Sequence, residues 1–528
     1  MHGSELPSHS ENNGKPTYLV GVPRVILLIA LALATFLIVL DYSIANVSIP
    51  YISGDLAVSN EQGTYVITSF AVGNSIGLPI TGWLTKRVGA VRLITLSILL
   101  FVVFSWACGS APNFQFLVVS RFLQGLVSGP LIPLSQTLII TTNPPEKKNR
   151  VLALWSAVVV AAPIVGPILG GWISYDYTWP WIFYINLPVG IVSAIAIWIL
   201  LKKRETAISQ EPLDWVALLF LAIFVSCLQV FLDKGEQYDW FNSIWMRTFF
   251  ITSCISFFLM ILWSINVERP LLELRLFKIP SYAVSVLFMG ISYSIYFGSV
   301  VLIPLWLQEN MGYTAIWAGL AVCPIGIAPM LFADMSGRLV NRIGSVIPLA
   351  ICFVLFAVSC FYTAFFDTDV DIYVIGFSRF LLGLALVFFI TPLFSLNVRD
   401  IPNEKLASGT GMFHFVRAMM GGVGTSVFTT IWVRRSAYHH EVLGESVTPF
   451  TPQSNLYFDK LNDLGINGSQ ALEITNNVVN NQAAVLAIND CFWLMGWIFL
   501  SLMILLPLGK RKKTQTGAIN LPQASVGE

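Results

Sequence analysis

Two stretches bounded by glycine, Gly82-Trp-Leu-Thr-Lys-Arg-Val-Gly89 and Gly337-Arg-Leu-Val-Asn-Arg-Ile-Gly344, share one pattern and lie about 255 residues apart. Each precedes a second matching pair of segments, Ser120-Arg-Phe-Leu-Gln-Gly125 and Ser378-Arg-Phe-Leu-Leu-Gly383. The distance from the first glycine to the serine is 38 residues in one copy and 41 in the other. Both copies lie among long apolar runs. The sequence therefore predicts a duplicated membrane half, which is typical of transporters.

The composition is that of an integral membrane protein. Of 528 residues, 55% are hydrophobic and 11% are charged, whereas soluble chains carry roughly 25% charged residues. Backbone groups in lipid must pair internally, so these apolar runs predict helices rather than strands. The seven cysteines show no metal-ligand spacing, and we interpret them as reduced thiols. We expect no metal and no cofactor, and the net charge of +1 gives no sign of nucleic acid binding.

The expected fold is all-α, with fourteen transmembrane helices. The predicted spans cover residues 25–47, 63–84, 92–110, 114–140, 150–172, 181–201, 214–232, 245–265, 281–307, 314–336, 346–366, 372–397, 406–433 and 486–508. With a cytoplasmic N-terminus, 22 of the 30 lysines and arginines fall on cytoplasmic segments and five on the opposite face. The other three, Arg121, Arg379 and Arg417, fall inside spans. This asymmetry predicts that both termini are cytoplasmic.

The repeat also divides the chain. We predict a cytoplasmic tail (1–24), a first six-helix half (25–201), a linker with an inserted helix pair (202–280), a second six-helix half (281–508) and a cytoplasmic tail (509–528). The second half includes a long outer loop over residues 434–485.

At these motifs the sequence resembles the major facilitator superfamily. The segment from Gly82 to Gly89, with Arg87, is similar to the superfamily's signature between the second and third helices. The run Leu40-Asp-Tyr-Ser-Ile-Ala-Asn-Val-Ser-Ile-Pro50 resembles the first-helix signature of the drug:proton antiporter-2 family, whose fourteen-span layout also matches. One departure is Lys86, which stands where the loop signature usually carries Asp. We therefore assign no cytoplasmic charge latch to Lys86.

Further runs extend the resemblance to a group of multidrug exporters within that family. They are Gln62–Phe70, Ser105–Gly109, Gly129–Gln136, Trp181–Pro188 and Gly312–Leu320. The resemblance implies a proton-driven exporter of hydrophobic compounds in the bacterial inner membrane, not an enzyme. It also implies that a periplasmic adaptor and an outer-membrane channel complete the export path.

Ionisable side chains inside the bilayer are the first candidates for proton coupling, because each costs about 2.5–3.5 kcal/mol on insertion scales. Asp41 lies in the outer half of the first predicted span. A carboxylate there is either neutral or paired with a cation, and either state can change during a transport cycle. We predict that Asp41 exchanges protons against substrate. A structural ion pair or helix cap is the alternative.

Arg121 and Gln124 lie early in the fourth predicted span. Arginine keeps its proton, so Arg121 is expected to tune a nearby carboxylate, as the resemblance also implies; anchoring a helix is the alternative. Its counterpart Arg379 has no evident acidic partner, which favours a structural role. When the repeats are aligned, Asp41 stands opposite Ile295 and Gln124 opposite Leu382. The coupling machinery is therefore expected in the first half.

Four other polar residues are secondary candidates. Glu309 ends a span and either receives protons from the outer side or is a solvated loop acid. Asp334 precedes the second loop motif and is either a proton or cation site or a partner of Arg338 at i+4. His414 and Arg417 share one face of the thirteenth span. Histidine titrates near neutral pH, but a hydrogen-bonded packing role is equally open.

Two sets of residues complete the predicted site. Gly166, Pro167, Gly170 and Gly171 form the antiporter motif of the fifth span, where a kink and close helix approach are expected. The resemblance implies that this bend prevents leak, and ordinary small-residue packing is the alternative. An adaptable drug cavity should be aromatic and apolar. The candidates for its lining are Tyr42, Trp155, Tyr293, Tyr296, Phe297, Met412 and Phe413.

Two other functions remain open. The same fold can serve a dedicated exporter of an endogenous metabolite or siderophore. A signalling or channel protein belongs to a different class. The sequence carries no phosphate loop and no nucleophile–base constellation, which argues against an ATP-driven pump and an enzyme.

Overall fold

The computed structural model describes residues 18–509, except residues 20, 207, 210–211, 269 and 449. Every regular element within these residues is helical, in agreement with the predicted all-α fold. Most of the two predicted tails lies outside the described residues.

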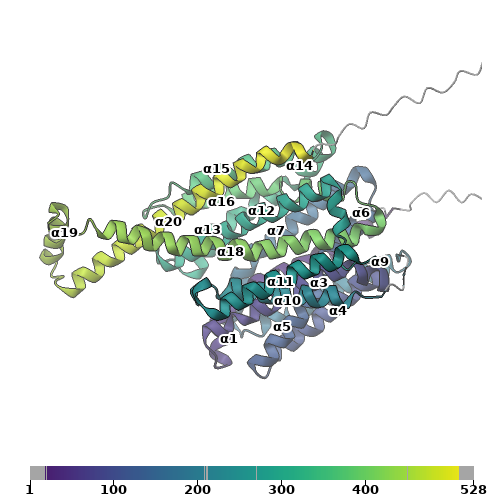
Figure 1. Ribbon diagram of the computed structural model, residues 1–528, viewed down its shortest axis with the longest axis horizontal. Helices are drawn as coiled ribbons and strands as arrows, with labels where there is room; N and C mark the ends of the chain where they lie inside the picture. Colours follow the sequence, from purple (N-terminus) through teal and green to yellow (C-terminus); the bar gives the residue numbers. More distant parts are fainter. Residues whose placement is uncertain are drawn as a thin grey trace, which may run out of the picture.

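The helices fall into three groups along the chain (Figure 1). The first half comprises α1 (Val22–Asp55), α2 (Asn60–Gly63), α3 (Tyr65–Val88), α4 (Ala90–Gly109), α5 (Phe114–Ser128), α6 (Leu131–Thr142), α7 (Pro145–Asp176), α8 (Trp181–Tyr184) and α9 (Asn186–Leu201). The inserted segment comprises α10 (Trp215–Lys234), η1 (Trp240–Asn242), α11 (Ile244–Asn266) and η2 (Leu274–Lys278). The second half comprises α12 (Pro280–Glu309), α13 (Ala315–Val322), η3 (Cys323–Gly326), α14 (Ile327–Ile343), α15 (Val346–Thr363), α16 (Ile372–Val387), α17 (Ile390–Val398), η4 (Asn403–Lys405), α18 (Leu406–Gly444), α19 (Pro452–Asp463), α20 (Ser469–Leu505) and η5 (Leu506–Gly509).

The described part contains 11 helical segments that are long and apolar enough to cross a membrane. Helices also cover the other three predicted spans, 63–84, 150–172 and 406–433, which lie in α3, α7 and α18. Several predicted spans are interrupted: 114–140 between α5 and α6, 181–201 between α8 and α9, 314–336 between α13 and α14, and 372–397 between α16 and α17. Proline lies at two of these breaks. Pro130 lies between α5 and α6, and Pro324 lies in the 3₁₀ turn before α14. Proline lacks the N–H that would continue the helical hydrogen bonds.

The two halves that share the sequence repeat also share the same pairs of packed helices. In the first half α1 packs along α7, α3 along α5 and α4 along α9. The second half repeats these pairs as α12 with α18, α14 with α16 and α15 with α20. The halves meet where α7 packs on α14 and α3 on α18. The two loop motifs end α3 and α14, so we call this end of the bundle the motif end.

Backbone geometry and close helix contacts explain why the loop motifs carry glycine at these positions. Gly89 and Gly344 end their helices with φ of 95° and 78°, a conformation that favours glycine. Gly82 and Gly337 lie where the halves touch. A Cβ on Gly82 would lie 2.0 Å from Ser408 Oγ, and one on Gly337 would lie 2.6 Å from the Cα of Arg150. Both copies therefore use glycine for the same close contact.

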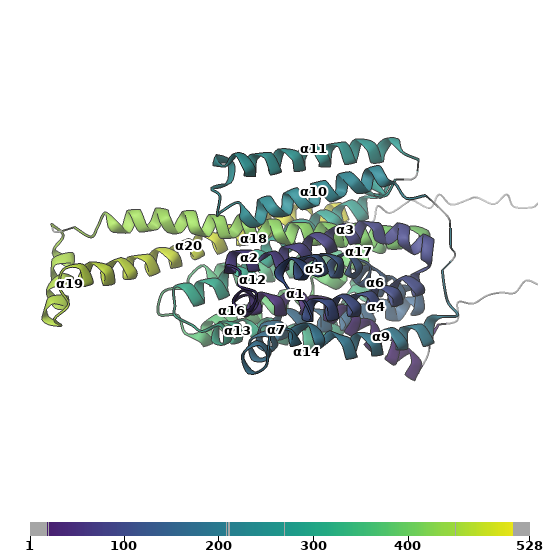
Figure 2. The same cartoon turned by 90° about the horizontal axis from the view of Figure 1, so that it is seen from below.

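The inserted helices α10 and α11 form an outer layer against one side of the bundle (Figure 2). The inner helix, α10, packs on α3 and α18 and thus touches both halves. Most of α11 is exposed and apolar, with Ile251, Ile255 and Phe258 at 54–60% exposure. Such a surface fits contact with lipid chains.

Most of the predicted outer loop, 434–485, is helical. The chain continues in α18 to Gly444 and resumes in α20 at Ser469, and both helices project past the bundle with α19 at the tip (Figures 1 and 2). Asp490 of α20 accepts hydrogen bonds from Arg435 Nε and His439 Nε2 of α18, both at 2.7 Å. We call this projection (434–485) the hairpin. These contacts join its two helices, so the segment is a helical extension rather than an irregular loop.

Candidate functional site

Asp41 lies in a closed polar cluster inside the first half. Its side chain is 0% exposed. Arg121 Nη1 pairs with Asp41 Oδ2, while Asn186 Nδ2 and Gln124 Nε2 donate to Oδ1 at 2.8 and 3.2 Å. Gln124 Nε2 also donates to Ser105 Oγ at 2.8 Å. Four helices, α1, α4, α5 and α9, thus meet at one buried carboxylate, and we call these five residues the Asp41 cluster.

Arg121 has several acceptors besides Asp41. Its Nε donates to the carbonyl oxygen of Val66 at 3.0 Å and its Nη1 to Gln124 Oε1 at 2.8 Å. Its guanidinium lies 4.5 Å from the Phe70 ring centroid and 5.3 Å from that of Phe183. Its Nη2 is buried without a hydrogen-bond partner among the described residues. The cation therefore has alternative neighbours and one spare donor.

The sequence predicted three members of this cluster and missed two. Asp41, Arg121 and Gln124 are brought together as expected. Asn186 and Ser105 were not singled out, although both lie in runs that carried the family resemblance. An asparagine that begins a helix, as Asn186 begins α9, looks like an ordinary turn residue. Only the packing of α9 against α1 and α4 reveals its contact with Asp41.

Arg379, the counterpart of Arg121, has a different environment. Its donors reach Thr363 Oγ1 at 2.8 Å, Ser378 Oγ at 3.1 Å and the carbonyl oxygen of Ser299 at 3.5 Å. No described carboxylate pairs with it, and its side chain is 0% exposed. These neutral contacts hold helices of the second half together and offer no titratable partner.

Asp334 joins the two halves at the motif end. It pairs with Arg338 at i+4, at 2.5 Å, and also with Arg150 of α7. Beside this pair, Asn149 Nδ2 donates to Asn341 Oδ1 at 2.6 Å. The expected i+4 pair is present, but it is only part of a contact between halves that the sequence did not indicate.

Neutralising Asp334 should loosen this contact. Partly exposed ion pairs contribute at most about 1 kcal/mol, so Asp334→Asn is expected to raise the open population at the motif end by about two- to fivefold. Double electron–electron resonance between spin labels at positions 147 and 342 would measure the distance between α7 and α14 at the motif end. Arg338→Gln is the matched control, because it removes only the pair within α14. Equal distance distributions for Asp334→Asn and wild type would show that the Asp334 ion pairs do not hold the two halves together at this end.

His414 and Arg417 form a chain that crosses between the halves. His414 Nε2 lies 2.6 Å from Oε1 of Gln136 in α6. Arg417 Nε donates to His414 Nδ1 at 3.2 Å, and its Nη1 donates to Tyr293 Oη in α12 at 2.8 Å. The sequence predicted the shared face of His414 and Arg417 but not their contact with Gln136.

The antiporter motif packs closely on α1. A Cβ on Gly166 would lie 2.5 Å from Ser43 Oγ, and one on Gly170 would lie 2.7 Å from the carbonyl oxygen of Ile44. Gly171 has more space, and the Pro167 side chain lies outside the description. In the second half, a Cβ on Gly424 would lie 2.0 Å from the carbonyl oxygen of Ser294. Close approach is thus common to both halves, whereas the Gly-Pro pair occurs only in the first.

The other predicted residues divide by exposure. Glu309 is exposed at the end of α12. Trp155, Met412 and Phe413 are at most 7% exposed and belong to the packed core. Tyr42, Tyr293, Tyr296 and Phe297 are partly exposed. The ring centroids of Tyr293 and Phe297 are 5.6 Å apart. The four partly exposed aromatic residues are therefore the better candidates for contact with a substrate.

One acidic residue was missed because it lies just past a predicted span. Asp233, near the end of α10, is exposed, accepts a hydrogen bond from Thr68 of α3 and accepts another from Gln229 Nε2 at 2.9 Å. The predicted span ended at residue 232. Asp233 therefore adds a carboxylate where the inserted pair meets the first half.

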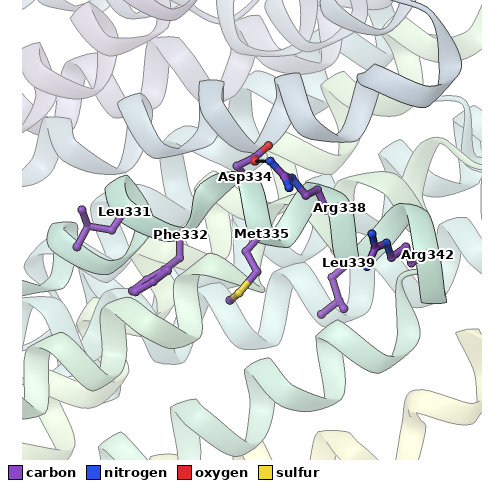
Figure 3. Close-up of a pocket in the computed structure, with 7 residues that line it drawn as sticks. All are labelled: Leu331, Phe332, Asp334, Met335, Arg338, Leu339 and Arg342. Atoms are coloured by element: carbon purple, nitrogen blue, oxygen red, sulfur yellow. Dashed lines mark ion pairs between the residues drawn. The ribbon is translucent and has the colours of Figure 1, made fainter.

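A separate open pocket of about 430 Å³ is lined only by residues of α14. Figure 3 shows Asp334 and Arg338 pointing toward each other, whereas Phe332, Met335 and Leu339 point the other way. All of its lining comes from one helix, so this pocket is distinct from the Asp41 cluster.

Sequence comparisons agree with this geometry. The family model of the Major Facilitator Superfamily matches residues 31–425. The chain is 41% identical over 491 residues to the multidrug export protein EmrB of Haemophilus influenzae, covering 93% of this chain and 96% of that protein. It is 40% identical over 486 residues to EmrB of Escherichia coli K12, with 92% and 95% covered. It is 41% identical over 484 residues to the fatty acid resistance protein FarB of Neisseria gonorrhoeae, with 91% and 95% covered.

Structural comparison gives the same fold. The human organic anion transporter MFSD10 aligns with a TM-score of 0.60 at 13% identity, over 92% of this chain and 100% of that one. A bacterial homologue of the lysosomal transporter Spinster aligns with a TM-score of 0.54 at 14% identity, over 93% and 98%. The chain is therefore a member of the major facilitator superfamily, homologous to the EmrB multidrug export proteins, and is a multi-pass membrane transporter rather than an enzyme.

Proposed function

We propose that this protein is a proton-coupled antiporter that exports hydrophobic drugs and toxic compounds across the bacterial inner membrane. The observation that carries the proposal is the Asp41 cluster. It holds a carboxylate that is 0% exposed and paired with an arginine. An ionisable pair inside the membrane marks a proton path more often than a stabilising device, because it is costly to bury. The names of the EmrB relatives support drugs as the cargo.

The cluster offers a way to couple protonation to movement. When Asp41 takes a proton, its attraction for Arg121 weakens, and Arg121 must rely on Val66 and Gln124 as acceptors. Arg121 Nη2 and Asn186 Oδ1 are both buried without partners among the described residues. This spare donor and acceptor allow the contacts to rearrange. Because α1 also packs along α7, a change at Asp41 would reach the antiporter motif at Gly166 and Gly170.

We further propose fourteen spans with both termini in the cytoplasm. The distribution of lysine and arginine supports this orientation. It places the motif end in the cytoplasm and the hairpin in the periplasm. There the hairpin would bind a periplasmic adaptor of the EmrA type. The transporter, this adaptor and an outer-membrane channel would together form a tripartite efflux system. Exposed apolar side chains on the hairpin support docking, among them Phe450 at 92% and Leu464 at 76%.

Transport in proteoliposomes tests the proposal. An imposed proton gradient is expected to drive uptake of a hydrophobic drug into inside-out vesicles, together with measurable proton release from their lumen. Collapsing the gradient with an ionophore should stop the uptake. Uptake that is indifferent to the proton gradient would refute proton coupling.

A dedicated exporter of an endogenous metabolite or siderophore is the alternative. Substrate breadth separates the two functions. A deletion strain should become sensitive to several unrelated drugs if the protein is a multidrug exporter. If it instead retains one metabolite and keeps its drug resistance, the alternative holds.

A further inference from the structure

One face of α14 combines an apolar strip with two cations. These residues line the open pocket of about 430 Å³, whose volume lies within the range of roughly 300–1,000 Å³ for small-molecule sites. Leu331, Met335, Arg338 and Arg342 follow one another at intervals of four, three and four residues, so they share one side of the helix. Figure 3 shows them in this order along α14, with both arginines toward its last turn at the motif end.

The apolar strip is exposed and has the length of one leaflet of a bilayer. Leu331 is 68% exposed, Met335 45% and Phe332 38%. Arg342 lies 11 residues after Leu331, which is about 16 Å along the helix. This length is roughly half of a hydrocarbon core about 30 Å thick. An acyl chain of one leaflet can therefore run along the strip from the arginines to Leu331.

The two arginines of the pocket are not fully neutralised within the described protein. Arg342 is exposed, and none of its donors meets an acceptor among the described residues. The Arg338 side chain is 62% exposed, and its one partner among those residues is Asp334. Asp334 also pairs with Arg150 of α7. One carboxylate is thus shared by two arginines, while Arg342 keeps its full charge.

The first turn of α7 adds further positive charge beside the pocket. Asn341 Nδ2 of α14 donates to the carbonyl oxygen of Glu146 at 2.9 Å, which places this turn against the end of α14. Lys147 is exposed and Lys148 is partly exposed, and neither forms an ion pair with a described residue. Glu146 is the acid of this turn. Cations therefore outnumber anions around the end of α14.

From these observations we infer that this face of α14 binds an anionic phospholipid of the surrounding bilayer. Its phosphate would lie at Arg338 and Arg342, and one acyl chain would run along Met335, Phe332 and Leu331. A guanidinium donates two parallel hydrogen bonds to a phosphate, and basic pockets beside membrane helices bind anionic head groups. A free phosphate would use the arginines alone and leave the apolar strip uncovered.

This inference goes beyond the proposed function, because the lipid is a bound component of the membrane and not a cargo. It would lie next to the contact that Asp334 makes with Arg150 between the halves. With the orientation proposed above, the lipid belongs to the cytoplasmic leaflet. Neither proton coupling nor the identity of the exported compound enters the inference, so its test and the transport test can fail independently.

Native mass spectrometry of the delipidated full-length protein in detergent tests this site. The probes are phosphatidylglycerol and phosphatidylcholine with the same palmitoyl and oleoyl chains. Wild type is expected to bind the first phosphatidylglycerol about tenfold more tightly than phosphatidylcholine, because each arginine near a membrane surface strengthens binding of anionic lipid. Arg338→Gln combined with Arg342→Gln should reduce this preference to less than about threefold. Met335→Asn keeps both arginines and places an amide in the strip, so it should weaken both lipids alike.

Arg275→Gln combined with Lys278→Gln is the matched control. Both residues are exposed in η2, and their loss removes two positive charges as well. This control should keep the wild-type preference for phosphatidylglycerol. If the Arg338 and Arg342 double variant does not fold, Arg342→Gln alone decides, since it loses no contact with a described residue.

Three results would overturn the assignment. The first is equal affinity of wild type for the two lipids. The second is loss of the preference in the Arg275 and Lys278 control to the same extent as in the Arg338 and Arg342 variant, which would assign it to overall charge. The third is displacement of phosphatidylglycerol by excess inorganic phosphate, which would identify a site for a free anion instead of a lipid.

Discussion

Asp41→Asn is expected to reduce proton-driven export by the folded protein to the rate seen without a gradient, although the substitution also leaves Arg121 without its counter-ion. Asparagine keeps the size of aspartate and can still contact Gln124 and Asn186, but it cannot take up and release a proton. The side chain that it replaces is 0% exposed and pairs with Arg121. Drug uptake and proton release in proteoliposomes measure the effect, and size-exclusion profiles measure folding.

The control for this variant is Asp369→Asn, which neutralises an exposed carboxylate between α15 and α16. Its export rate should match that of wild type. Gradient-driven export by Asp41→Asn at the wild-type rate would show that protons pass through another group. Asp233 of α10, which contacts Thr68 of the first half, would then be the next residue to neutralise.

Arg121→Gln is expected to destabilise the protein strongly. Removing one partner of a buried ion pair leaves an uncompensated charge, which costs about 3–5 kcal/mol. Asp41 would keep only the amides of Gln124 and Asn186, which donate at 3.2 and 2.8 Å. Thermal unfolding in detergent should show a clearly lower midpoint, and any folded fraction should lack proton-coupled export.

A double variant separates charge from packing. Asp41→Asn combined with Arg121→Gln removes both charges, so it should regain most of the lost stability without regaining transport. Arg379→Gln is the comparison in the second half, since Arg379 pairs with no described carboxylate. It should leave the pH dependence of export unchanged. If the double variant is as unstable as Arg121→Gln, the pair does not account for the loss.

Much of the fold could be predicted because membrane helices are locally determined. Long apolar runs form helices in lipid regardless of their neighbours, since their backbone groups pair within the segment. The hairpin was harder to predict. Residues 434–485 are rich in polar side chains, so they were predicted as an outer loop, with helix-like apolar spacing only over residues 456–485. Their helices are joined by the contacts of Arg435 and His439 with Asp490, which lies 55 and 51 residues further along the chain.

The site was predicted in part for a similar reason. A charge in an apolar run is visible in the sequence, so Asp41, Arg121 and Arg417 could be found there. Ordinary polar residues such as Ser105 and Asn186 carry no such signal. Asp334 was visible as well, but its pairing with Arg150 across the halves depends on how α7 packs against α14.

The two Ser-Arg-Phe-Leu segments show most clearly what could not be predicted from the sequence. The sequence by itself determined that Arg121 and Arg379 lie at corresponding places in membrane helices, because local apolarity sets which segments enter the bilayer. Only the tertiary structure decided that Arg121 pairs with Asp41, 80 residues away, while Arg379 donates to Thr363, Ser378 and Ser299. Helix packing brings such partners together, and the strength of a buried charge's interactions depends on which partner it meets.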